Sequence, residues 1–225
     1  MTAGWTEYRK LLLGELALDG VSLKRAAAEV VDPGLERLLS LATNLDPSSE
    51  EGHARIVELA EGEEGKRTIV QLAAIASLKQ LGRVAPKSAP DRLLGVVVEV
   101  LLAELAGETL GAYADGTVRY INRTGKVLVW EARDPKVSDL VSQLFTQGGK
   151  VWEFAAEGLG PLPRRAPSGS VPWVRVSLLS KGRVRAIEGY PGEAKSDPQK
   201  RMEPVFSVAA VLLRTLVAMS SRAEL

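Results

Sequence analysis

The chain has 225 residues, of which 45% are hydrophobic and 25% charged, so it is long enough to bury a core and too apolar to be disordered as a whole. It has no cysteine and one histidine, which excludes disulfides, cysteine nucleophiles and the common Cys/His zinc sites. We therefore predict no metal and no cofactor. The lack of cysteine is compatible with a reducing cytoplasm, where we expect the protein to be.

The formal net charge is only +1, but it is unevenly distributed. Residues 1–116 contain 12 basic and 18 acidic residues, whereas residues 117–225 contain 17 basic and 10 acidic residues. Such polarity is expected where the two halves complement each other, where copies assemble head to tail, or where the basic half binds an anionic partner. Ordinary solvation with a chance imbalance is an equally open alternative.

The first 84 residues have the apolar spacing of helices, with Trp5, Tyr8 and Leu12 at intervals of three and four. Ser22 is predicted to cap a helix that Asp32-Pro33-Gly34 ends, and residues 46–49 are predicted to start another. A longer helix is expected over residues 67–81. Residues 84–90 contain two prolines and read as a linker, so we predict a helical bundle region over 1–85 and an α+β sheet domain over 86–225.

The second region mixes helical and strand patterns. Residues 92–106 are apolar on nearly all helical faces and predict a buried helix. Three β-rich runs follow in residues 109–131, separated by Asp115-Gly116 and by residues 122–125, which is a strong hairpin signal. Asp134-Pro135 predicts a helix start, residues 173–189 a second hairpin, and Glu203-Pro204 the start of a final helix. The predicted fold class is α+β, with the order α-βββ-α-ββ-α and a five-stranded antiparallel sheet.

Pairing the hairpins predicts which side chains share a face. A two-residue turn at Asp115-Gly116 would place Tyr113 opposite Val118. Tyr120 would then face Leu128, and Val118 would face Trp130, so that one face carries Tyr113, Tyr120 and Trp130. In the second hairpin, Val176 is predicted opposite Ile187 and Arg175 opposite Glu188. Because both faces of the first sheet are substantially apolar, we expect each to be covered or to form an interface.

The order of elements after residue 86 is similar to that of the roadblock, PAS and GAF domains, small sheet-and-helix domains used as sensors and dimerisation platforms. This similarity of layout implies a small-ligand sensor as one possible function. Its ligand pocket would lie between the sheet and a helix and would be lined by Tyr113, Tyr120 and Trp130.

A basic set near the second hairpin is the best candidate for a binding site. Residues 161–202 contain nine basic and three acidic residues. The predicted partner-binding residues are Arg164, Arg165, Trp173, Lys181, Arg183, Arg185, Lys200 and Arg201. Cations interleaved with aromatic rings can bind an acidic protein surface or a nucleic-acid backbone. The sequence pI near 7.9 and the lack of a known nucleic-acid-binding motif favour a protein partner.

No catalytic residue is assigned. The lone His53 lies in a polar stretch where an exposed helical histidine is expected, and Glu99 is a single charge within an apolar segment. Residues 62–68 contain two glycines and Gly-Lys, but they lack the spacing of a phosphate-binding loop.

We accordingly expect a cytosolic, non-catalytic module for protein–protein interaction or assembly, whose partner is another protein or a second copy as a homodimer. A small-ligand sensor and a nucleic-acid-binding protein remain as alternatives. No membrane segment is expected, because the apolar runs at 93–105 and 205–219 are interrupted by charge and shorter than the roughly 20 residues that a span requires.

Overall fold

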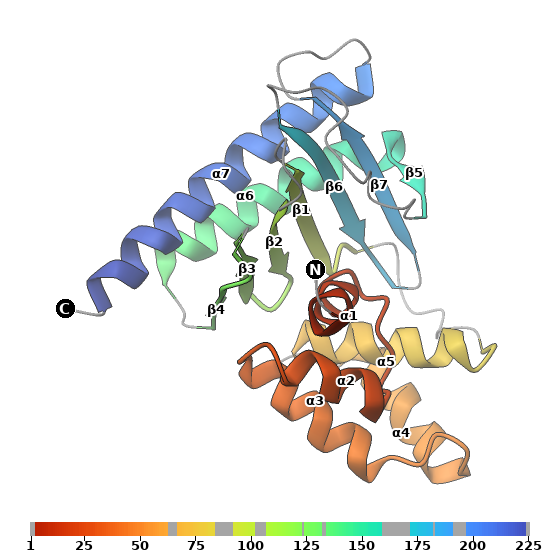
Figure 1. Cartoon of the computed structure of the whole chain (residues 1–225). Helices are drawn as coiled ribbons and strands as arrows, with labels where there is room; N and C mark the ends of the chain where they lie inside the picture. The colour runs from red at the N-terminus through yellow and green to blue at the C-terminus, as the bar shows by residue number, and fades with distance from the viewer. Residues whose placement is uncertain are drawn as a thin grey trace. The chain divides into compact units, whose positions relative to one another are not determined.

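The computed structural model describes residues 3–62, 67–83, 92–101, 107–122, 124–131, 134–158, 172–181, 183–190 and 197–223 (Figure 1). The chain forms two compact units. One is helical and contains Met1–Leu94 with Ser180–Gly182. The other contains Gly95–Leu179 with Arg183–Leu225 and is built on a sheet. The predicted linker at residues 84–90 lies outside the described residues.

The helical unit is organised around a central apolar helix. Its helices are α1 (Ala3–Leu12), α2 (Gly20–Ala27), α3 (Pro33–Asn44), α4 (Glu50–Glu61) and α5 (Thr68–Gln80). Every residue of α5 from Thr68 to Leu78 is buried, and α4, α1 and α3 pack against it. Because α5 is apolar around its whole circumference, it is stable only when it is surrounded in this way.

Local capping sets the helix boundaries. The predicted start after residues 46–49 is confirmed, because Ser49 Oγ accepts a hydrogen bond from the backbone N–H of Gly52 at 3.0 Å. The predicted helix over 67–81 is also confirmed as α5. Ser22 is not the cap of α2, however. The side chain of Asp19 accepts bonds from Val21 and Ser22, and it precedes the helix, where a cap has to lie.

Asp32 has a larger role than the predicted helix stop. It is the N-cap of α3, with Oδ1 accepting a bond from Gly34 N at 2.8 Å, and its Oδ2 accepts a bond from Tyr8 Oη at 2.7 Å. Both side chains are fully buried. One carboxylate therefore joins the start of α3 to α1, 24 positions away in the sequence.

The sheet unit contains a seven-stranded antiparallel sheet in the order β4-β3-β2-β1-β6-β7-β5 (Figure 1). The strands are β1 (Gly95–Leu101), β2 (Gly107–Tyr113), β3 (Val118–Ile121), β4 (Val127–Trp130), β5 (Ala156–Glu157), β6 (Trp173–Leu179) and β7 (Val184–Gly189). The predicted α+β class is confirmed, and the sheet has two strands more than expected.

The predicted helix at 92–106 is wrong, because residues 95–101 form β1 at the centre of the sheet; residues 102–106 lie outside the described residues. Val96, Val97, Val98 and Val100 are β-branched and suit a strand. A strand that is buried on both faces is apolar at consecutive positions, so its pattern resembles that of a helix that is buried all round. The second additional strand is the two-residue edge strand β5.

The turn between β2 and β3 is one residue longer than predicted. Tyr113 N donates to Thr117 O at 3.0 Å, and Gly116 has a φ of +83°, so the loop contains three residues and ends in a left-handed glycine. Val118 therefore pairs with Ala112 instead of Tyr113. Because a slip of one residue reverses the faces, Tyr113 lies on the opposite side of the sheet from Val118.

The other predicted registers are confirmed. Val118 pairs with Trp130 and Tyr120 with Leu128 in the β3–β4 hairpin. In the β6–β7 hairpin, Val176 pairs with Ile187 and Arg175 with Glu188.

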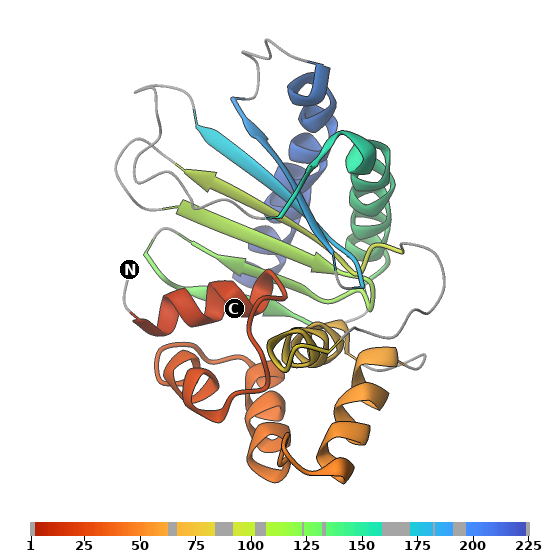
Figure 2. The same ribbon diagram turned by 90° about the vertical axis from the view of Figure 1, so that its right-hand side faces the viewer.

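One face of the sheet is apolar, and two helices cover it. Figure 2 shows α6 (Pro135–Val151) and α7 (Asp197–Ala223) on the same side of the sheet. They pack along each other, α6 against β1 and β2 and α7 against β6 and β7. Asp134 caps α6 as predicted, but α7 begins six residues before the predicted start at Glu203 and continues through Pro204.

The opposite face carries buried charges. Arg119, Arg175 and Glu99 point to this side and are at most 2% exposed. Arg119 Nη2 donates to Glu131 Oε1 at 3.3 Å, and its guanidinium lies 5.7 Å from the centre of the Tyr113 ring. The Tyr113 ring fits over Gly111, where a Cβ atom would come within 2.8 Å of the tyrosine oxygen.

Arg175 repeats this arrangement on β6. Its Nε and Nη2 donate to Glu188 Oε2 at 3.0 and 2.8 Å, and the guanidinium lies 5.2 Å from the centre of the Trp173 ring. Glu99 is the register neighbour of Arg175 on β1. Each buried arginine thus combines an acidic partner with an aromatic ring, as a buried cation requires.

We predict that Tyr8→Phe costs about 1.5 kcal/mol of unfolding free energy, because a hydrogen bond to a carboxylate is lost. Asp32→Ala should cost about 3 kcal/mol, since it removes the α3 cap and leaves the buried Tyr8 hydroxyl without this acceptor. In urea unfolding, the double variant should be little less stable than Asp32→Ala. Additive costs would contradict the coupling.

Arg175→Met should destabilise the protein by about 3 kcal/mol, because it removes the buried cation that pairs with Glu188 and leaves the buried Glu99 beside an apolar side chain. Glu188→Gln should cost about 1 kcal/mol, since the side chain of Glu188 is half-exposed and an amide oxygen can still accept a bond. Unfolding in guanidinium chloride, followed by tryptophan fluorescence, measures both. Equal losses would contradict the dominant role of the arginine.

Candidate functional site

The predicted basic set does not form one continuous surface in the described part of the chain. Trp173 is buried on the charged face of the sheet, whereas Arg185 belongs by register to the face that the helices cover. Lys181 is half-buried at the hairpin tip, and Arg183 is exposed at the start of β7. Arg164 and Arg165 lie outside the described residues.

Arg185 and Arg201 of this set meet at one short turn. The 3-10 helix η1 (Trp152–Phe154) follows α6 directly. Arg185 on β7 lies over the ring of Trp152, 5.1 Å from its centre, and its Nη1 donates to Trp152 O at 3.0 Å. Arg201 in α7 lies over the ring of Phe154 at 4.1 Å. We call these four residues the arginine–aromatic cluster.

Sequence reasoning found both arginines of this cluster but neither aromatic ring. Trp152 lies 33 positions before Arg185, and Phe154 lies 47 positions before Arg201. An alternating Trp-Glu-Phe directly after an amphipathic helix is the only local signal. The pairing itself depends on how β7 and α7 return to the end of α6.

The electrostatics of the cluster differ from those of the buried arginines on the other face. Arg185 Nε is buried without a hydrogen-bond partner. Within the part of the chain that the structure describes, no carboxylate forms an ion pair with Arg185 or Arg201. Glu157 pairs with Arg185 in strand register but is exposed to solvent. The cluster therefore contains two guanidinium groups that lie over aromatic rings and that form no ion pair with a carboxylate of the described residues.

The three aromatic residues predicted to line a ligand pocket are not brought together. Tyr120 and Trp130 lie on the helix-covered face, as the β3–β4 register requires, but Tyr113 lies on the charged face. Trp130 Nε1 is buried without a hydrogen-bond partner. The cause is the three-residue β2–β3 turn, which moves Tyr113 to the other side.

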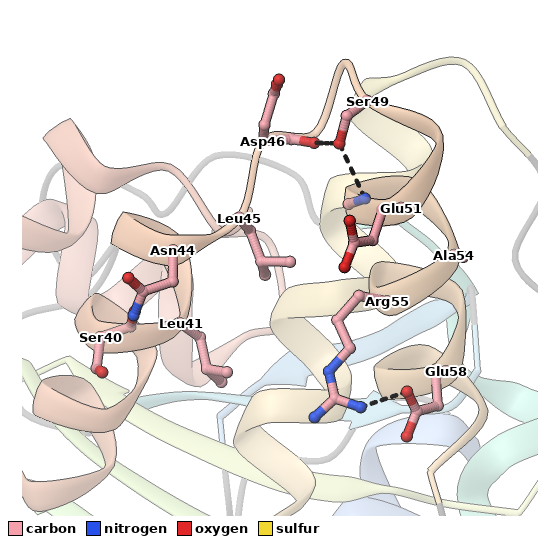
Figure 3. A pocket seen from close by; sticks show the side chains of 11 residues that line it. Ser40, Leu41, Asn44, Leu45, Asp46, Ser49, Glu51, Ala54, Arg55 and Glu58 are labelled. Atoms are coloured by element: carbon pink, nitrogen blue, oxygen red, sulfur yellow. Dashed lines mark hydrogen bonds and ion pairs between the residues drawn. The ribbon is translucent and has the colours of Figure 1, made fainter.

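A groove of about 690 Å³ opens between α3 and α4 in the helical unit (Figure 3). Leu41, Leu45 and Ala54 supply its apolar lining. The polar lining residues are Ser40, Asn44, Asp46, Ser49, Glu51, Arg55 and Glu58. Sequence reasoning did not anticipate this groove, because helix spacing does not reveal how far two helices diverge.

Most charged side chains of the groove form ion pairs or hydrogen bonds with neighbouring residues. Arg55 and Glu58 form an exposed ion pair. The hydrogen bond from the Ser48 side chain holds the pKa of the Asp46 carboxyl below its ordinary value. These interactions indicate a solvated surface and not an acid–base pair for catalysis.

Other residues with potential chemistry are dispersed. His53 lies on α4, half-buried, with Nε2 unpartnered. Among the residues that the structure describes, no group of three or more His, Cys, Asp or Glu side chains could hold a metal ion. Residues 63–66 of the glycine-containing stretch at 62–68 lie outside the description.

No family model, no curated protein and no solved structure matches this chain.

Proposed function

We propose that the protein is a non-catalytic assembly module that forms a homodimer through the outer face of α7. We define this face by Ala210, Val211, Val217 and Ala218, which fall on the side of the helix opposite its buried residues. The observation that carries the proposal is the exposure of large apolar side chains on a helix whose other side already packs on the sheet. Val211 is 41% and Val217 46% exposed.

The inner side of α7 packs against other elements of the sheet unit. Its buried residues are Met202, Val205, Ala209, Leu212 and Leu216, which recur at intervals of three and four. This stripe packs along α6 and on β6 and β7. A surface helix of a globular protein ordinarily carries polar residues on the remaining side, which α7 largely lacks.

The outer face is nearly free of charge. Between residues 204 and 220, Arg214 is the single charged residue. Its Nε donates to Ala210 O of the same helix at 3.2 Å. The segment Lys200–Ser220 has a mean hydropathy of 1.6 and is 28% buried. Large apolar patches of this kind mark interaction sites in soluble proteins.

Length and hydropathy alone would also fit a membrane span. A span would have to detach the buried stripe from α6 and the sheet, and this would expose the core of the unit. Docking of a protein onto the outer face leaves the inner packing intact. We therefore propose a soluble protein and, because cysteine is absent, a cytoplasmic location.

A second copy is the partner that suits this face. An antiparallel pair of α7 helices would match apolar side chains with apolar side chains and would need no complementary charges. Ala210 and Ala218 are small and permit close approach of the two helices. A strongly acidic partner could form an ion pair on this face with Arg214 alone.

The substitution pair Val211→Asp/Val217→Asp should convert the dimer to a monomer. Burial of each valine contributes roughly 1.5 kcal/mol, and a buried carboxylate adds a desolvation cost, so the dimer dissociation constant should rise more than about 100-fold. Light scattering after size exclusion, over a range of concentrations, measures this, and circular dichroism checks that the fold is retained.

The matched control is Val31→Asp, because Val31 is 86% exposed in the helical unit and its substitution should leave the dimer unchanged. A native protein that stays monomeric at high concentration would overturn the proposal. A dimer that persists in the α7 double variant would also overturn it.

A further inference from the structure

We propose that the arginine–aromatic cluster is a binding site for an acidic peptide segment of a partner protein. The site comprises Trp152, Phe154, Arg185 and Arg201. It goes beyond the assembly role, because it lies at the end of α6 and at the start of α7, whereas the outer face of α7 begins at Ala210.

Aromatic rings lie against the two arginines of the cluster, and no carboxylate of the described residues pairs with either of them. A guanidinium that lies over an aromatic ring uses its flat face for that contact, so its N–H groups stay available in the plane. Arg201 is exposed, and within the described residues no ion pair or hydrogen bond engages it. Arg185 Nη1 donates a hydrogen bond to Trp152 O, and Arg185 Nε has no hydrogen-bond partner among the described residues. The exposed Arg201 can therefore receive a carboxylate directly, and Arg185 adds positive charge at the same turn.

The second step is that the cluster contains an exposed aromatic surface. Phe154 is 42% exposed even though Arg201 lies over its ring. Exposed aromatic residues beside arginine are the residue types that dominate binding energy at protein interfaces. The arrangement thus offers apolar contact and charge at the same point.

The third step is the position of the cluster at an open sheet edge. The sheet ends at β5, which is two residues long and pairs on one side with β7. Ala156 and Glu157 are exposed. An extended peptide can add main-chain hydrogen bonds at such an edge while its side chains reach neighbouring groups.

The charge of the occupant follows from the cations at the start of α7. Glu153 and Glu157 are exposed on η1 and β5, but within the described residues neither forms an ion pair with these cations. Lys200 is exposed next to Arg201, and no described carboxylate pairs with it. Glutamate or aspartate side chains at alternate peptide positions would supply the missing anions. A nucleic acid would need a longer track of phosphate contacts than the three cations Arg185, Lys200 and Arg201 provide, which favours the peptide.

Fluorescence anisotropy with a labelled twelve-residue peptide of alternating glutamate and threonine tests this inference. We expect saturable binding to the full-length protein and none by the matched peptide with lysine in place of glutamate. Arg201→Gln should weaken binding about tenfold, the value of one charge-assisted hydrogen bond. Phe154→Ala should also weaken it, although this substitution leaves the net charge unchanged.

The matched control is Arg37→Gln, which removes the same charge from an exposed position on α3 and should leave the affinity unchanged. Absence of saturable binding would overturn the proposal, as would an equal effect of Arg37→Gln. Tighter, Arg201-dependent binding of a twelve-nucleotide oligothymidylate would assign the site to nucleic acid instead. The α7 variant Val211→Asp/Val217→Asp should still bind the peptide, which separates this test from that of the homodimer.

Discussion

Strand β1 hydrogen-bonds along its length to β2 on one side and to β6 on the other, and this double pairing holds the sheet unit together. Without β1, the meander of β2, β3 and β4 and the hairpin of β6 and β7 would be two small separate sheets, each marginal in water. The pairing of β1 with β6 joins residues more than 70 positions apart in the sequence. It also fixes which side chains of both hairpins share a face.

The two faces that β1 defines have different chemistry. The apolar face is covered by α6 and α7, and its strand residues Val96, Val176 and Leu178 are fully buried. The opposite face contains Arg119 and Arg175, each with a glutamate partner and an aromatic ring. A buried charge is tolerated only with such partners. The paired charges on this face therefore favour one strand register over others more than they add to the net stability. A one-residue slip would separate both pairs.

The surfaces that remain free are at the periphery of the unit. The outer face of α7 exposes apolar side chains, and the arginine–aromatic cluster contains cations that no carboxylate pairs with among the described residues. These two features differ in chemistry and in place, so they suit two different occupants. Neither requires a catalytic group, which is consistent with the dispersed positions of His53 and the carboxylates among the described residues.

Local chemistry in the sequence determined the features whose causes lie within a few residues. Ser49 and Asp134 cap their helices, and the β3–β4 and β6–β7 registers follow from their turns. The sequence also showed that Arg185 and Arg201 belong to a strongly basic region.

Only the tertiary structure decided that the segment at 92–106 contains a strand. A strand that is buried on both faces lacks the alternation of apolar and polar residues that distinguishes a strand from a helix. Tertiary contacts also decided that Trp152 and Phe154 meet these arginines, since stacking across 30 residues or more leaves no local pattern. The side of the sheet on which Tyr113 lies depended on a single additional residue in its turn.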